Sequence, residues 1–292
     1  LESGSPMQRS STRGIHATAG LGLVILAALA SQNAAALSVT DIRPASASNL
    51  EGQDASAIAI SNDPINSARA VGGDVGISTT PGLRGGDGTA VADTTTSGPG
   101  QATADGRGGS ARFGTSGIGG DGSATARVTS TAPALVQASA VAFGGAGSFD
   151  FVGGPAGPGG NAIVDVAGRS SGNGGAIELG VLRIPDGPFT QQPGAFGGNA
   201  QDTALAGVGG NAQSRSVAIA EGDGRIVVLD RARGGQATLG TGGNATSYAE
   251  GQNAGRSSIQ VEANATSGFG GTARGVVSAR ARGVSTGGGD VF

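Results

Sequence analysis

Pairs of adjacent glycines recur at regular intervals in the second half of this chain. From Gly197 to Gly234 the interval is 37 residues, and from Gly234 to Gly270 it is 36. A fixed period of this size is typical of proteins that stack copies of one supersecondary unit. The sequence therefore predicts a repeat of roughly 36 residues, with a short arm and a long arm that each begin with Gly-Gly.

The glycine pairs are predicted to form turns between strands. Glycine adopts positive φ at no steric cost and lets backbones approach closely at a turn or bulge. Asn or Asp follows several of the pairs, and both tolerate the left-handed region. The predicted turn residues are Gly85, Gly86, Gly119, Gly120, Gly197, Gly198, Gly209, Gly210, Gly234, Gly235, Gly242, Gly243, Gly270 and Gly271.

The runs between these pairs alternate small and polar residues. In 272–282 small residues fall on one face and arginines mostly on the other, and 257–265 and 211–220 alternate similarly. A period of two is that of a β-strand, whereas a helix would need a spacing of three and four. The sequence therefore predicts an all-β fold, either a glycine-rich repeat β-solenoid or a stacked β-sheet, with a small-residue core.

Phenylalanine occupies selected positions beside the glycine pairs. Phe143, Phe196 and Phe269 each immediately precede Gly-Gly. We interpret them as plugs that close the core at a turn. The alternative is an aromatic ladder that stacks on a ligand, but the chain has only 8 Phe and one Tyr.

The N-terminal region has the pattern of a secretory signal. Residues 1–6 are expected to be an upstream extension or a cloning scar, and residues 7–36 a signal peptide with a basic start, an apolar core over 21–30 and a small-residue cleavage site ending at Ala36. The apolar core is too short to span a bilayer. We therefore expect a secreted protein, extracellular or on the cell surface, with no membrane span after cleavage.

The remaining chain divides into two predicted regions. Residues 37–81 have few glycines and are expected to form an N-terminal cap or an extended arm, followed by a glycine-rich β-repeat domain over 82–292. Repeat proteins need caps at their ends. If this region is instead an arm that pairs with a neighbouring molecule, its subunit contacts would be Leu37, Val39 and Ile42.

The residue inventory argues against catalysis and against ligands. After residue 36 the chain has no His, Cys or Lys, which removes the usual nucleophile systems, Schiff-base lysine and His- or Cys-based zinc. The formal charge of −3 leaves no basic face for nucleic acid. The two Gly-Gly-Asp-Gly runs lack the tandem copies of a calcium-binding repeat. We expect no enzyme activity, no cofactor, no metal and no nucleic-acid partner.

Short glycine-rich pieces carry a resemblance to known proteins. The Gly-Gly-Asn-Ala runs and the run at 153–160 resemble glycine-rich secreted surface proteins, and the mycobacterial PE-PGRS proteins share Gly-Gly-x runs of this kind. The helical N-terminal domain of that family is absent from this sequence, so no residue role is carried over. In overall character the chain is similar to bacterial extracellular fibre or matrix proteins of β-repeat type.

Export, repeats, small-residue strands and the absence of catalytic groups indicate a structural protein. We expect a secreted subunit that self-assembles head-to-tail, as a homopolymer, into an extracellular filament or a biofilm matrix. The alternatives are a monomeric surface adhesin or ice-binding β-solenoid, and a disordered glycine-rich coat. An ice binder would show a Thr-x-Thr ladder once per coil, whereas the threonines at 94–96 and 129–131 look isolated in the sequence.

Overall fold

The computed structural model describes residues 36–78, 80–111, 116–148, 156–180, 193–200 and 207–292. The predicted extension and almost all of the predicted signal peptide lie outside these ranges. In the described residues every regular element is a β-strand and none is a helix. The strands are β1 (Ala36–Ile42), β2 (Ala55–Ser61), β3 (Ile65–Val71), β4 (Gly88–Thr96), β5 (Gly100–Arg107), β6 (Gly122–Ser130), β7 (Leu135–Phe143), β8 (Ala162–Ser170), β9 (Ala176–Leu179), β10 (Gly194–Phe196), β11 (Ala212–Ala220), β12 (Arg225–Arg233), β13 (Ala245–Asn253), β14 (Ile259–Thr266) and β15 (Val277–Ser285).

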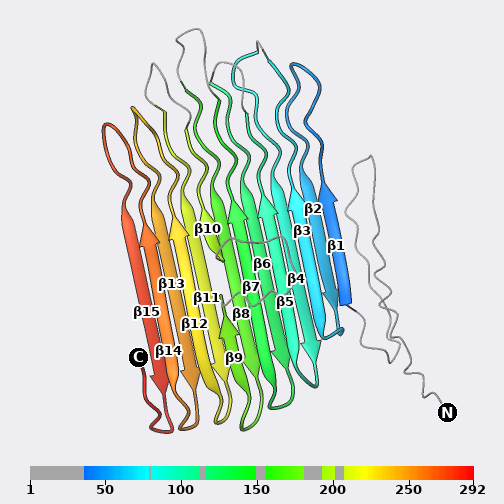
Figure 1. Cartoon of the computed structure of the whole chain (residues 1–292), viewed down its shortest axis with the longest axis vertical. Coiled ribbons are helices and arrows are strands. Elements are labelled where there is room, and N and C mark those ends of the chain that lie inside the picture. The colour runs from blue at the N-terminus through cyan, green and yellow to red at the C-terminus, as the bar shows by residue number, and fades with distance from the viewer. Residues whose placement is uncertain (1–35, 79, 112–115, 149–155, 181–192, 201–206) are drawn as a thin grey trace, which may run out of the picture.

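These strands form two parallel sheets stacked face to face (Figure 1). Sheet A has the order β1-β3-β5-β7-β10-β12-β14, with β9 beside β7 and β12, and sheet B has the order β2-β4-β6-β8-β11-β13-β15. The chain passes from one sheet to the other after almost every strand, so the fold is solenoid-like. The first strands, β1 to β3, belong to the same two sheets as the strands after Gly82. Strands β1 and β15 lie at opposite ends of the stack (Figure 1).

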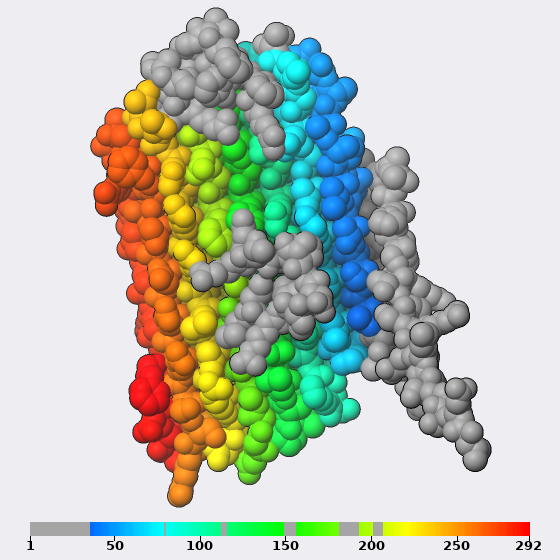
Figure 2. Space-filling model, in the orientation of Figure 1, coloured from blue at the N-terminus to red at the C-terminus, as the bar shows by residue number. Residues whose placement is uncertain are grey.

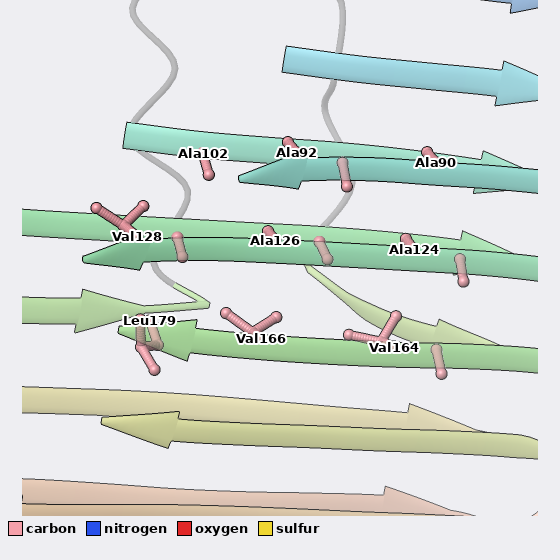
Figure 3. Packing of buried hydrophobic residues seen from close by; sticks show 14 of the residues in the cluster. Ala90, Ala92, Ala102, Ala124, Ala126, Val128, Val164, Val166 and Leu179 are labelled. Atoms are coloured by element: carbon pink, nitrogen blue, oxygen red, sulfur yellow. The ribbon is translucent and has the colours of Figure 1, made fainter. Parts of the chain in front are cut away.

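The space between the sheets is filled mainly by alanine. Inward side chains such as Ala90, Ala92, Ala124 and Ala126 are at most 1% exposed (Figure 3). The period-two prediction is confirmed in β11, where every second residue from Ala212 to Ala220 is buried. Alanine gives up little area per residue, so much of the cohesion rests on backbone hydrogen bonds and close packing.

Larger buried side chains lie where the opposite sheet has glycine. Ile177 and Leu179 of sheet A are fully buried. A Cβ atom on Gly168 of sheet B would lie 2.8 Å from a methyl carbon of each of them. Gly251 is placed in the same way against Ile226 and Ile259. The two sheets are therefore complementary in shape row by row, not uniformly small.

The glycine-rich segments that return from sheet A to sheet B interlock through one row of backbone hydrogen bonds, which we call the glycine seam. In each bond a glycine N–H donates to the carbonyl of the residue facing it in the other layer, at 2.8 or 2.9 Å. The seam runs from Gly268 through Gly243, Gly235, Gly210, Gly198, Gly160, Gly145, Gly120, Gly109, Gly86 and Gly73 to Gln53. Before every donor except Gly268 stands another glycine, which bonds within its own layer instead, as Gly197 does to Arg233.

Close approach, and not positive φ, explains the glycine pairs. None of the fourteen predicted turn glycines has a positive φ, a conformation found among described residues at other glycines such as Gly172 and Gly174. At Gly198 an added Cβ would lie 1.9 Å from the carbonyl oxygen of Gly145. The prediction of left-handed turns at these pairs was therefore wrong. The close approach of two backbones, which was also expected at these glycines, is present.

The Asn and Asp residues after the pairs also avoid the left-handed region. Their side chains form a row in which each oxygen accepts a hydrogen bond from the backbone N–H one coil further along, at 2.6–3.0 Å. The acceptors are Asp54, Asp87, Asp121, Asn161, Asn211 and Asn244, and the last donor is Val276. These side chains therefore bind successive coils together.

One glycine pair, Gly270-Gly271, lies outside the seam. Thr266 is aligned with Arg233, so Ser267-Gly268 occupies the place that Gly234-Gly235 occupies one coil earlier. The strand predicted over 272–282 likewise begins only at Val277. Glycine doublets therefore marked the interlocking segments correctly except in the first coil, where Gly52-Gln53 takes this place, and in the last.

Candidate functional site

The C-terminal end of the stack presents an uncovered strand. In sheet B β15 extends one strand beyond β14, the last strand of sheet A. The first three core-facing residues of β15, Val277, Ala279 and Ala281, are consequently exposed. Val277 is 47% exposed although its aligned neighbour Ala245 is 1% exposed. Val276, just before the strand, is 73% exposed. This end therefore leaves the side chains of Val276 and Val277 and the outer edge of β15 open to solvent. In Figure 2 β15 lies in the orange-red edge of the molecule.

A short C-terminal tail covers part of the edge of β14. The N–H of Ile259 donates to Asp290, the N–H of Val261 donates to Phe292, and the N–H of Phe292 donates to Ile259. Val291 is bridged to Ile259 in parallel and lies against Gly283. The tail therefore stands where a further strand of sheet A would begin, and no described residue pairs with β14 beyond Val261 on that side.

The N-terminal end is offset in the opposite sense. Here sheet A extends beyond sheet B, because β1 pairs with β3 and has no described strand on its other side. Leu37 and Val39 are half-buried and pack against the core of their own chain, and Ile42 is 54% exposed. The three residues named as subunit contacts thus lie on an edge strand, with one side paired inside the chain.

Phenylalanine does not plug the core. Phe143 and Phe196 lie on the outer face of sheet A, where their rings stack with centroids 4.9 Å apart, and Arg107 lies over the Phe143 ring. Phe269 is 56% exposed in a return segment, with Arg274 over its ring. The plug interpretation fails because an alanine core leaves no space for a ring, and the side chain before each return segment points outward.

The outer face of sheet B carries a polar cluster near its C-terminal end. The hydroxyl of Tyr248 donates to Glu250 at 2.6 Å, and Arg282 forms an ion pair with the same carboxylate at 2.8 Å. These bonds lower the pKa of Glu250, and the hydrogen bond from the Tyr248 hydroxyl has the largest effect. The same hydrogen bond raises the pKa of Tyr248. Arg280 lies over the Tyr248 ring. The C-terminal arginines thus have partners within their own chain.

One carboxyl group lies in the core, which the sequence reasoning missed. Asp230 of β12 is 5% exposed and accepts hydrogen bonds from the hydroxyls of Ser214, Ser216 and Ser247 and from the N–H of Tyr248, at 2.6–3.1 Å. Burial raises the pKa of Asp230, and these hydrogen bonds oppose the rise. The signal was present in the sequence, because Asp230 stands in phase with the inward residues Val228 and Ala232.

The described residues contain no group of three acidic or histidine side chains that could hold a metal ion. None of them belongs to a helix that could cross a membrane. The geometry that remains as a candidate site is therefore the pair of open ends. No family model matches the chain, and neither a curated protein nor a solved structure matches it.

Proposed function

We propose that this protein is a secreted structural subunit that assembles head-to-tail with copies of itself into an extracellular filament or matrix of bacterial type. The observation that carries the proposal is that each sheet ends in an edge strand at both ends in the described residues, and that the core-facing residues Val277, Ala279 and Ala281 of β15 are exposed. An open strand edge is a template for pairing with another chain. Head-to-tail contacts that do not close by rotation give a filament and not a ring.

The exposed apolar residues support the same reading. Val276 and Val277 lie at the start of β15, and Val291 and Phe292 lie near its other end, next to Gly283. Each of the four is at least 46% exposed. Burial of these side chains against another copy would favour the contact. The predicted signal peptide and the glycine-rich repeat fit a component that is exported before it assembles. Repetition of one coil along the stack makes each additional copy a continuation of the same architecture.

The alternatives have less support in the structure. Thr94–Thr96 of β4 lie beside Thr129 of β6, so these threonines are not isolated, but Thr94 is fully buried. The outer row of sheet B that contains Thr89 and Thr246 also contains Ile163 and Gln213. An ice-binding face would need threonine in each coil. A disordered coat does not agree with two stacked sheets.

The test is assembly by the purified chain, both at its full 292 residues and from Leu37 onward, which is the form that the predicted cleavage would release. We expect filaments of uniform width in negative-stain microscopy. We expect them to persist in 1 M salt, where the Debye length is about 3 Å, because backbone pairing and apolar burial dominate the contact.

A matched pair of variants links the filament to the end of the stack. Ala279 faces the core side of β15 and Ser278 faces the outer side, and both are exposed in a single copy. Ala279→Lys should abolish filaments, because an inward-pointing charge on an edge strand prevents pairing, whereas Ser278→Lys should keep them. A monodisperse monomer from the unsubstituted chain at every concentration would overturn the proposal.

A further inference from the structure

We propose that successive copies join through a lap joint that completes both sheets at once. In this joint Leu37–Ile42 of one copy pairs with Val261–Thr266 of the preceding copy in sheet A. In sheet B Ala55–Ser61 pairs with Val277–Gly283. The inference rests on the proposed function and specifies the contact that would carry it.

The offset of the two sheets is the first support. At the C-terminal end sheet B projects by β15, and at the N-terminal end sheet A projects by β1. Each strand in the interior packs between two strands of the opposite sheet, but β15 packs on β14 alone and β1 on β2 alone. If a second copy is placed end to end with the first, its β1 covers the core side of β15 and pairs beside β14 of the first copy. Each chain therefore has the projecting strand of sheet B at one end and the projecting strand of sheet A at the other.

The register of sheet A supplies the second support. Following the parallel pairs from β1 through β3, β5, β7, β9 and β12 to β14 places Leu37 level with Val261 and Val39 level with Ala263. All four residues face the core. A slip of one residue would turn every side chain of a strand to the other face. The two strands can therefore pair only if their core-facing residues stand at the same levels, and this register satisfies that condition.

Sheet B continues with the same agreement. Following β2 through β4, β6, β8, β11 and β13 to β15 places Ala57 level with Ala279 and Ala59 level with Ala281. The joint would thus bring Ala57 beside Ala279 and Ala59 beside Ala281, as Ala57 lies beside Ala90 and Ala59 beside Ala92 within the sheet. The exposed core side of β15 would then lie under Leu37 and Val39 of the next copy.

Residues 290–292 already occupy one end of the β14 edge that the joint uses. Their hydrogen bonds occupy the edge of β14 only at Ile259 and Val261. Val291 is aligned with Ile259, so Phe292 stands at the level of Gln260, the level that Ala36 has in the register above. The incoming strand therefore pairs only from Leu37, level with Val261, and follows the tail along the same edge. The molecule already contains such a split row, because β9 pairs with the first part of β12 and β10 with its last part. In the joint, residues 290–292 and the incoming strand would share the edge of β14 in the same way.

Disulfide cross-linking tests this register directly, because the chain has no cysteine of its own. Ser38 and Glu262 point outward at the same level of the joint, and both are exposed in a single copy. Neighbouring strands are about 5 Å apart, within disulfide reach. Ser38→Cys with Glu262→Cys should give a ladder of covalent multimers on a non-reducing gel after mild oxidation of the assembled protein.

The control shifts one cysteine by a single step along the same face. Asn264 is also outward and exposed, but a cysteine at that position would stand about 8 Å from the one introduced at Ser38 of the next copy, beyond disulfide reach. Ser38→Cys with Asn264→Cys should therefore assemble and give no ladder. Filaments with no ladder from the first pair, or with equal ladders from both pairs, would overturn the joint and leave the proposed function standing. No assembly by any of these proteins would overturn both.

Discussion

At the scale of single residues, a hydrogen atom in place of a methyl group decides whether the two layers can interlock. Gly198 donates its N–H to the carbonyl of Gly160 at 2.8 Å. A Cβ atom added to Gly198 would lie 1.9 Å from the carbonyl oxygen of Gly145. Both contacts are with backbone, which no side-chain rotation can relieve. The seam therefore tolerates glycine alone at this position.

We accordingly expect Gly198→Ala to lower the free energy of unfolding by about 3 kcal/mol, the upper range for overpacking. Gly98 is the matched control, because an added Cβ there meets nothing within 4 Å and its φ is not positive. Gly98→Ala should leave the thermal midpoint nearly unchanged. Equal midpoints for the two variants would contradict the requirement for glycine in the seam.

Asp230 gives a residue-scale prediction with a defined sign. Burial raises the pKa of Asp230 in the folded chain above the unfolded value of about 3.9. Between these two pKa values the folded state keeps a proton that the unfolded state has lost, so this group's contribution to stability falls as the pH rises. Asp230→Asn removes the titration and keeps a polar group beside the three serines.

The melting temperature of Asp230→Asn should therefore rise relative to the parent as the pH increases from about 4 toward neutrality. Thermal melts of both proteins across that range measure the difference. Asp165→Asn makes the same chemical change on the outer face of sheet B, at a carboxylate paired with Arg127. A parent-to-variant difference that stays constant with pH would show that Asp230 does not titrate in this window.

At the scale of the elements, stability depends on matched rows between the sheets. Leu179 of β9 fills the space that Gly168 of β8 leaves opposite it. Leu179→Ala should cost about 3 kcal/mol for the lost side chain and its cavity. Gly168→Ala should be destabilising through its 2.8 Å approach to Leu179.

Combining the two substitutions should cost less than the sum, because the new methyl group enters the cavity that the first substitution opens. A coupling of about 1 kcal/mol is expected for residues in direct contact. Denaturant unfolding of the parent, both single variants and the double variant gives this coupling. Strict additivity would contradict the row-by-row complementarity.

The strands were the part of the fold that the sequence predicted best. In β11 and β14 the period of two identified the inward face correctly. Successive side chains of a strand point to opposite faces, so the residues that alternate as small or apolar in the sequence are the ones that are buried. The start of β15 was predicted five residues early, since Ala273 and Gly275 continue the alternation into a return segment. Phe143 was misplaced for a different reason: adjacency to Gly-Gly says nothing about which face a side chain takes.

At the scale of the whole molecule, the sequence left a solenoid and a stack of flat sheets open, and the structure combines features of both. Two parallel sheets are stacked, and the chain alternates between them. The number of residues from one coil to the next varies along the stack. The neighbouring strands β8 and β11 begin 50 residues apart, whereas the neighbouring strands β11 and β13 begin 33 apart. A fixed period could not reveal that variation. The offset of the ends, and hence the candidate site, follows from topology that no local pattern encodes.

The glycine seam has a mechanical consequence. Its bonds cross between the layers in nearly every coil, so a force that slides one sheet along the other loads all of them together. A force that lifts one terminal coil loads only the last bond, from Gly268 to Gly243. The molecule should therefore be stiff in shear and weak in peeling, and a copy held at both ends by neighbours would be protected against the mode in which it is weak.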